Sequence, residues 1–213
     1  MAYPTIDAPY GLKPIGLIGG QPYAGAVRHI PIADNYATSI YNGDVVMYKN
    51  DGTLIIGTAD TDTSAVAGVV GVFTGCTFTD PNTGQQTFSN KYTQTNITQG
   101  TIEAYVIDDP NVLYKAVAVT DGTEDSATGG LLPTATGISR ANSISCNAEL
   151  VTNAGVDLSG RSRQGIFVNN VATALPITIV DVVEDTKIGD DAYVEFIVKI
   201  NATYQRYTHT VGV

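Results

Sequence analysis

The side chains that could do chemistry in this sequence are few, and none has the spacing of a catalytic site. A Ser-His-acid nucleophile needs a histidine as its base, and the chain has two, His29 and His209. His29 lies in a segment rich in proline and glycine, His209 lies near the C-terminus, and the sequence has no Gly-x-Ser-x-Gly turn. We therefore expect both histidines on the surface or at a partner contact, and we predict that the chain is not an enzyme.

Metal and cofactor sites are not indicated either. Cys76 and Cys146 are about seventy positions apart, which is not a metal-ligand spacing, and two histidines without a cysteine pair do not predict catalytic zinc. The two cysteines are either buried thiols or a disulfide, and the sequence leaves both open. The glycines of residues 16–20 lack the Lys-Ser/Thr pair and the following helix of a phosphate loop. We expect no cofactor and no metal.

Pairs of acidic residues are the most suggestive chemical feature. They are Asp60 and Asp62, Asp108 and Asp109, Glu124 and Asp125, Glu184 and Asp185, and Asp190 and Asp191. Calcium prefers oxygen-rich loops, and glycoside hydrolysis needs two carboxylates about 5–10 Å apart. None of the pairs has the spacing of a calcium loop, and all fall where β-turns are expected. We therefore expect solvated turns, with incidental calcium binding and a hydrolase pair as alternatives.

The elements that would position these residues are strands. Residues 45–49 and 53–57 are short runs rich in valine and isoleucine, joined by Asn50-Asp51-Gly52, a pattern typical of a hairpin. Residues 65–73 are almost entirely apolar and contain Gly68 and Gly71, which predicts a strand buried on both faces and bent at its glycines. Residues 41–73 therefore predict the start of a small, strongly curved β-barrel or sandwich.

Further strands are expected along the rest of the chain. The runs 102–107, 112–119, 166–168 and 176–183 have strand composition. In residues 193–200 Val194, Phe196, Val198 and Ile200 alternate with Tyr193, Glu195, Ile197 and Lys199, and the first set should face the core. Residues 74–100 are polar and predict a surface hairpin or loop. The fold class is all-β: a small curved β-barrel or sandwich with an extended N-terminal arm and long loops.

The N-terminal segment differs from the rest of the chain. Residues 1–33 contain five of the nine prolines and should form neither a helix nor a good central strand. The segment is too apolar for a solvated linker. We predict an extended arm, residues 1–33, on a body of residues 34–213 with a surface insertion around 74–100. The alternative is an arm lying over its own barrel. The candidate partner-binding residues are Tyr10, Leu12, Ile15, Leu17, Ile18 and Tyr23.

Charge excludes some partners. The net charge is −10 with a pI near 4.4, which argues against a nucleic-acid-binding surface. Residues 1–33 have a net charge of +1, which leaves −11 on the other 180 residues. No apolar run is long enough for a transmembrane helix, and residues 1–9 have no features of a signal peptide. We expect neither a nucleic acid nor a membrane as partner.

Two stretches of the sequence resemble a known family. One runs from Tyr10-Gly11-Leu12-Lys13-Pro14 through Arg28-His29-Ile30-Pro31-Ile32-Ala33 to Gly43-Asp44-Val45-Val46, and the other is Leu175-Pro176-Ile177-Thr178-Ile179-Val180-Asp181 with Val198-Lys199-Ile200-Asn201. Together they resemble virion structural proteins of tailed bacteriophages, namely head decoration or cement proteins. The resemblance spans residues 10–201, although residues 74–165 are generic.

This resemblance implies a capsid decoration protein on the outer surface of the virion. Its partners would be the major capsid protein and itself, as a homotrimer, and it would stabilise the shell by contacts between neighbouring capsomers. One alternative is a phage tail or fibre module that binds a receptor or glycan, although the chain lacks tryptophan. Another is a β-rich hydrolase that uses an acidic pair.

Overall fold

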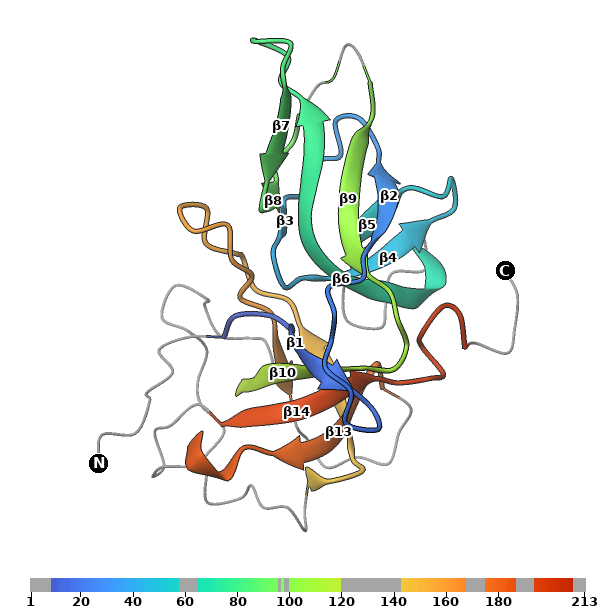
Figure 1. The fold of residues 1–213 in the computed structure, drawn as a ribbon, viewed down its shortest axis with the longest axis vertical. Coiled ribbons are helices and arrows are strands. Elements are labelled where there is room, and N and C mark those ends of the chain that lie inside the picture. Colours follow the sequence, from blue (N-terminus) through green and yellow to red (C-terminus); the bar gives the residue numbers. More distant parts are fainter. Residues whose placement is uncertain are drawn as a thin grey trace.

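The chain folds as two closed β-sheets that lie end to end (Figure 1). The computed structural model describes residues 9–57, 65–95, 97, 100–119, 143–167, 175–186 and 194–208. Apart from a 3-10 turn, η3 (Glu184–Thr186), the regular elements of these residues are strands. The predicted all-β fold, a barrel or sandwich, is confirmed.

The first sheet, which we call barrel 1, has five strands in a closed ring. Their order is β4 (Val45–Lys49), β5 (Leu54–Ile56), β2 (Arg28–Ile32), β9 (Ile102–Ile107) and β6 (Ala65–Thr79), and β6 pairs back to β4. β7 (Gln86–Ser89) extends the sheet beyond β6, and β3 (Ile40–Tyr41) pairs with β8 (Lys91–Tyr92) in a short ribbon. Among the described residues, β7 is therefore the one strand of this sheet that lies outside the ring.

The second sheet, barrel 2, is closed in the same way. Its ring is β10 (Val112–Val119), β12 (Gly165–Phe167), β11 (Asn147–Val151), β13 (Ile177–Val182) and β14 (Glu195–Ile200), which pairs back to β10. β1 (Lys13–Leu17) lies antiparallel to the start of β10. Within this ring the pair β10–β12 is parallel and the other pairs are antiparallel.

The hairpin that the sequence predicts is present at β4 and β5. The Lys49 N–H donates to the Thr53 carbonyl at 2.8 Å, and Gly52 adopts a φ of 83°, a value that glycine tolerates without steric cost. β6 bends at its glycines, as expected, so that it pairs with β4 along one half and with β9 and β7 along the other. A Cβ on Gly71 would overlap the Ile107 carbonyl oxygen, so close strand approach requires glycine at this position.

The described part of the N-terminal segment lies on the chain's own fold, which is the alternative stated above. It supplies β1 to barrel 2 and β2 to barrel 1. The expectation that the segment makes a poor central strand is wrong for β2, which lies between β5 and β9 and contains Pro31. The pairing of β2 with β5 is one residue pair, Ile32 with Leu54, so the missing N–H of Pro31 interrupts no long ladder. Residues 1–8 lie outside the described part of the chain.

The two barrels share one hydrophobic core at their junction. A single buried cluster contains Val45, Val72 and Ile107 of barrel 1 together with Val112 and Phe196 of barrel 2. The remaining apolar side chains of barrel 1 form a second cluster inside its own ring. Because apolar surface is buried between the barrels as well as within them, we expect the two to keep a fixed orientation.

Candidate interaction surface

The structure separates the six predicted contact residues into three groups. Leu12 is buried in the shared core, and Leu17 and Tyr23 pack against that core. Ile15 and Ile18 are exposed, with 45% and 50% of their surface accessible. Tyr10 belongs to neither set and is described below. Contact with a partner therefore requires movement for Leu12, whereas Ile15 and Ile18 are already accessible.

Tyr10 is held by a buried carboxylate of barrel 2. Its hydroxyl donates to Glu195 Oε1, and the ammonium of Lys115 lies 2.5 Å from Glu195 Oε2. Burial, followed by the hydrogen bond to Glu195, raises the pKa of Tyr10 well above its usual value. The ammonium of Lys13 lies 3.8 Å from the centre of the Tyr10 ring, a cation–π distance. This arrangement satisfies the carboxylate of Glu195 and ties residue 10 to barrel 2.

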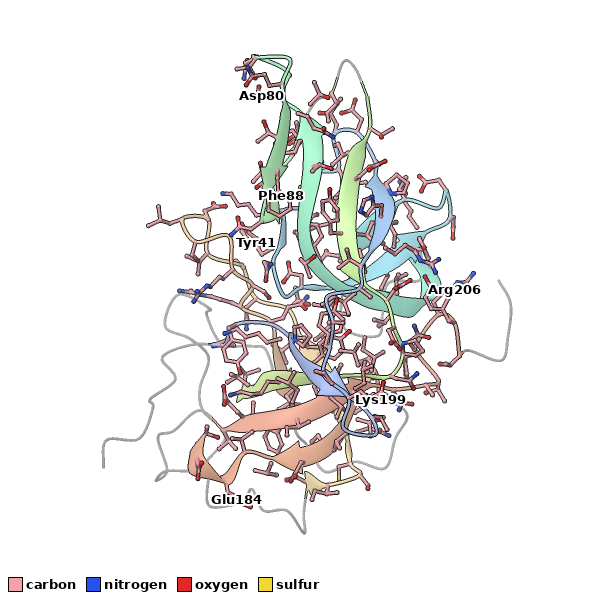
Figure 2. The ribbon with its side chains drawn as sticks, in the orientation of Figure 1. Tyr41, Asp80, Phe88, Glu184, Lys199 and Arg206 are labelled. Carbon is pink, nitrogen blue, oxygen red and sulfur yellow. The ribbon has the colours of Figure 1, made fainter. Side chains whose placement is uncertain are left out.

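The outer side of β1, β10, β14 and β13 forms a continuous face of barrel 2 (Figure 1), which we call the lysine face. Its residues in the described part of the chain are Lys13, Ile15, Lys115, Val180, Asp181, Ile197 and Lys199, with Glu195 buried beneath Lys115. Lys13 pairs with Lys115 across β1 and β10, and Lys115 pairs in turn with Ile197 of β14. Figure 2 shows Lys199 on barrel 2, and its backbone pairs with Thr178 of β13.

The sequence contained a partial signal for this face. The alternation in residues 193–200 places Glu195, Ile197 and Lys199 opposite the core positions, and Val194, Phe196, Val198 and Ile200 are buried as predicted. Glu195 departs from the pattern because Tyr10 and Lys115 cover it and leave it 5% exposed. Alternation gave no indication that Lys13 and Lys115 lie beside this strand, because the pairing is long-range.

Barrel 1 carries an aromatic row on its outer surface. Phe88 of β7 is 63% exposed and lies against Tyr105 at a centroid distance of 5.8 Å. The rings of His29 and Tyr105 pack in a T-shaped arrangement with their centroids 4.4 Å apart, and His29 Nδ1 lies 3.6 Å from Glu103 Oε2. A Cβ on Gly75 would come within 2.7 Å of the Phe88 ring, so the glycine makes room for this ring. His29 is therefore a surface residue with aromatic and acidic neighbours, as predicted, whereas His209 lies outside the described residues.

A hydrogen-bonded turn presents the apolar side chain of Leu158, which is 99% exposed. The turn is fastened to barrel 1 on both sides of this residue. Lys91 Nζ donates to the Asp157 carbonyl at 2.9 Å, and the Asn90 side chain donates to the Ser159 carbonyl at 2.9 Å. The hydroxyl of Tyr41 also donates to Asp157 at 2.9 Å. These hydrogen bonds hold the exposed turn of residues 157–159 against the segment that contains β3 and β8.

The other chemical candidates form no site among the residues that the structure describes. There, no group of three or more His, Cys, Asp or Glu side chains could hold a metal ion. Asp108 is paired with Arg28 at 2.6 Å and accepts a hydrogen bond from Tyr207. Cys76 is a buried free thiol whose pKa is raised to about 12 by desolvation, so no disulfide joins it to Cys146. The acidic pairs at 60–62, 124–125 and 190–191 lie outside the described residues.

Asp44 is a buried titratable group that sequence reasoning missed. It lies 1% exposed in the turn before β4, and its Oδ2 accepts a hydrogen bond from the Tyr41 N–H at 2.7 Å. Desolvation raises its pKa to about 6, against the opposing hydrogen bonds from Ser162 and Tyr41. Asp44 lies at the junction between the barrels, directly before Val45 of the shared core. We therefore assign it a role in stability and not in a reaction.

In the described part of the chain, no helix is long and apolar enough to cross a membrane. Comparison with models of protein families, with curated proteins and with solved structures finds no match for this chain.

Proposed function

We propose that the chain is a capsid decoration protein, which binds the outer surface of a tailed-phage head and stabilises the shell by contacts between neighbouring capsomers. The observation that carries the proposal is the exposure of Ile15 and Ile18 beside the packed remainder of the N-terminal segment. Two isoleucines that stay accessible next to a well-formed core mark a surface that a partner can cover. The proposal also rests on the sequence resemblance given above, and it includes a homotrimer bound to the major capsid protein.

The architecture is suited to a contact role. A closed sheet hides the edges of its strands, and two such sheets joined by a shared core form a rigid body. A rigid body binds without the conformational entropy cost of ordering a flexible arm, about 1–2 kcal/mol per residue of backbone. Repetition of the same weak contact over a shell would add avidity.

The experiment compares phage particles made with and without this chain. Heads that lack the chain should release their DNA at a lower temperature, while adsorption to host cells should be unchanged. The matched control restores the wild-type chain from a plasmid, which should restore the heat stability of the heads. Equal stability of the two kinds of head would contradict the proposal.

A second candidate function, a tail or fibre module that binds a receptor glycan, is favoured by the aromatic row on barrel 1. The exposed ring of Phe88 beside Tyr105, with Glu103 nearby, combines an apolar platform with a polar partner. In the same experiment, this function predicts a loss of adsorption with no loss of head stability. Phe88→Ala should reproduce that loss, whereas Leu158→Ala, an exposed side chain outside the row, should not.

A further inference from the structure

The lysine face has an unusual charge for this protein. The chain carries 21 acidic and 11 basic residues, so a lysine on its surface will usually have a carboxylate close by. Five lysines lie in the described residues, and three of them have an ion-pair partner: Lys49 with Asp51, Lys91 with Asp157 and Lys115 with Glu195. Among these same residues, Lys13 and Lys199 have no carboxylate within 4.0 Å, and both lie on the lysine face.

The geometry of the face keeps these charges together. Lys13 and Lys115 are direct cross-strand neighbours, an arrangement in which like charges repel and destabilise a sheet. Glu195 compensates Lys115, but its carboxylate is buried beneath the lysine and Tyr10. Burial, followed by the nearby guanidinium of Arg161, lowers the pKa of Lys13, while the carboxylate of Glu195 opposes this shift. The face therefore carries three lysines against two carboxylates: Glu195, which is buried, and Asp181, whose Oδ1 accepts a hydrogen bond from the Val182 N–H at 2.7 Å.

Apolar side chains lie between the lysines. Ile15 is exposed at the bulge in β1, Ile197 is half-buried beside Lys115, and Val180 is 38% exposed at the bulge in β13. A surface with an apolar centre and charged neighbours is typical of a protein contact, because the apolar part supplies affinity and the charges supply selection. A phosphate backbone would instead need a dense row of cations, and the net charge of −10 would repel it.

We propose that the lysine face docks on an acidic protein surface, and, building on the proposed function, that this surface is a carboxylate-rich patch on the outside of the capsid shell. Lys13 and Lys199 supply the charges that select it, and Ile15, Val180 and Ile197 supply the apolar contact. Face-to-face pairing of two copies of this chain is disfavoured, because it would set lysines against lysines.

The test measures binding of the purified full chain to capsid shells that lack it, by co-sedimentation at low and at moderate salt. Lys199→Glu should weaken binding at least about tenfold, and the wild-type chain should lose affinity as salt rises because the contact is between opposite charges. The matched control is Lys49→Glu, which makes the same charge change on barrel 1 and should bind like the wild type. Val180→Asp tests the apolar part, with Leu158→Asp as its control.

Each outcome has a definite meaning. If the wild-type chain binds and Lys199→Glu and Val180→Asp bind equally well, the docking face is wrong and the decoration function stands. If the wild-type chain does not bind the shells, the decoration function fails and the assigned partner fails with it. Sedimentation velocity of the same variants tests whether the face instead binds a second copy of this chain. If the substitutions abolish self-association without changing shell binding, the face joins copies of this chain and the proposal is overturned. Should Lys199→Glu not fold, Lys199→Gln removes the charge with less repulsion and should still weaken binding.

Discussion

Asp44 shows how one buried carboxyl group ties the stability of this fold to pH. Its side chain lies 1% exposed, and desolvation raises its pKa to about 6 from the usual 3.8 of an aspartate. The folded protein therefore binds this proton more tightly than the unfolded chain does, and folding takes up a proton in the window between these two values. The contribution of Asp44 to stability accordingly increases as the pH falls through 6 and decreases as the pH rises.

We predict that Asp44→Asn removes this pH dependence. Between pH 7.5 and pH 5 the wild-type protein should gain about 1 kcal/mol of unfolding free energy relative to the variant. Urea denaturation of both proteins at the two pH values measures the difference, and the other titrating groups cancel in the comparison. A difference that stays constant with pH, or that changes in the opposite direction, would contradict the assignment.

Gly11 and Gly20 form a matched pair for a second prediction. Both have positive φ angles, 76° and 83°, but a Cβ on Gly11 would overlap the Gly43 carbonyl, while a Cβ on Gly20 would have no atom within 4 Å. Gly20→Ala should cost about 1 kcal/mol from backbone strain alone. Gly11→Ala should cost about 3 kcal/mol or more, because the close approach between the N-terminal segment and the turn before β4 is lost as well. Thermal unfolding of the two variants compares them, and equal costs would rule out the close approach.

Among the elements, residues 201–208, which we call the C-terminal clasp, connect the two barrels. After β14 the clasp returns to barrel 1, where the Val69 N–H donates to the Tyr204 carbonyl at 2.6 Å and the Arg206 N–H donates to the Val69 carbonyl at 2.9 Å. The Tyr207 hydroxyl donates to Asp108 at 2.9 Å, and the Arg28 guanidinium lies 5.0 Å from the Tyr207 ring centre. Tyr207 thus fastens the C-terminal clasp to Asp108, which lies in the link between β9 and β10.

We expect Tyr207→Ala to loosen this clasp without unfolding the barrels. Hydrogen exchange should become about thirtyfold faster at the amides of Val69 and Arg206, because the hydrogen bond to Asp108 and the cation–π contact each contribute on the order of 1 kcal/mol. Exchange within β14 should not change. Phe88→Ala, which removes an exposed aromatic ring elsewhere on barrel 1, is the control. Unchanged exchange at Val69 would show that the clasp contributes nothing.

Local patterns predicted individual strands well. The hairpin of β4 and β5, the glycine bends of β6 and the core side of β14 follow from turn residues and from period-two alternation. Neither signal specifies which strand pairs with which, because partners such as β1 and β10 are about one hundred residues apart and alternation fixes only the face of each strand. For this reason the sequence predicts a separate N-terminal arm and one barrel, whereas the segment supplies β1 and β2 and the strands form two barrels.

The candidate surface was predictable only in part, for the same reason. Composition singled out Ile15 and Ile18, which are exposed, together with Leu12, Leu17 and Tyr23, which pack on the core. Whether an apolar residue of a proline-rich segment is exposed depends on which strands it packs against, and the sequence does not show that pairing. The grouping of Lys13, Lys115 and Lys199 likewise depends on the pairing of three strands.

The whole molecule is an acidic pair of barrels in which three of the five described lysines lie on one face of barrel 2, and the proposed function depends on this asymmetry. The net charge of −10 applies to the whole chain, yet two of the lysines without an ion-pair partner in the described residues gather on one side of barrel 2. Long-range repulsion keeps acidic molecules apart, while this face can still meet a carboxylate-rich surface. The proposed decoration function needs both properties, since copies of the chain must stay apart from one another and still bind the shell.

The most direct test of this account is a cryo-EM reconstruction of the intact phage particle that carries the chain. We predict density for both barrels on the outside of the head, with the sheet of β1, β10, β14 and β13 turned toward the capsid. Density on the tail, or on the head with that sheet turned toward solvent, would contradict the central claim.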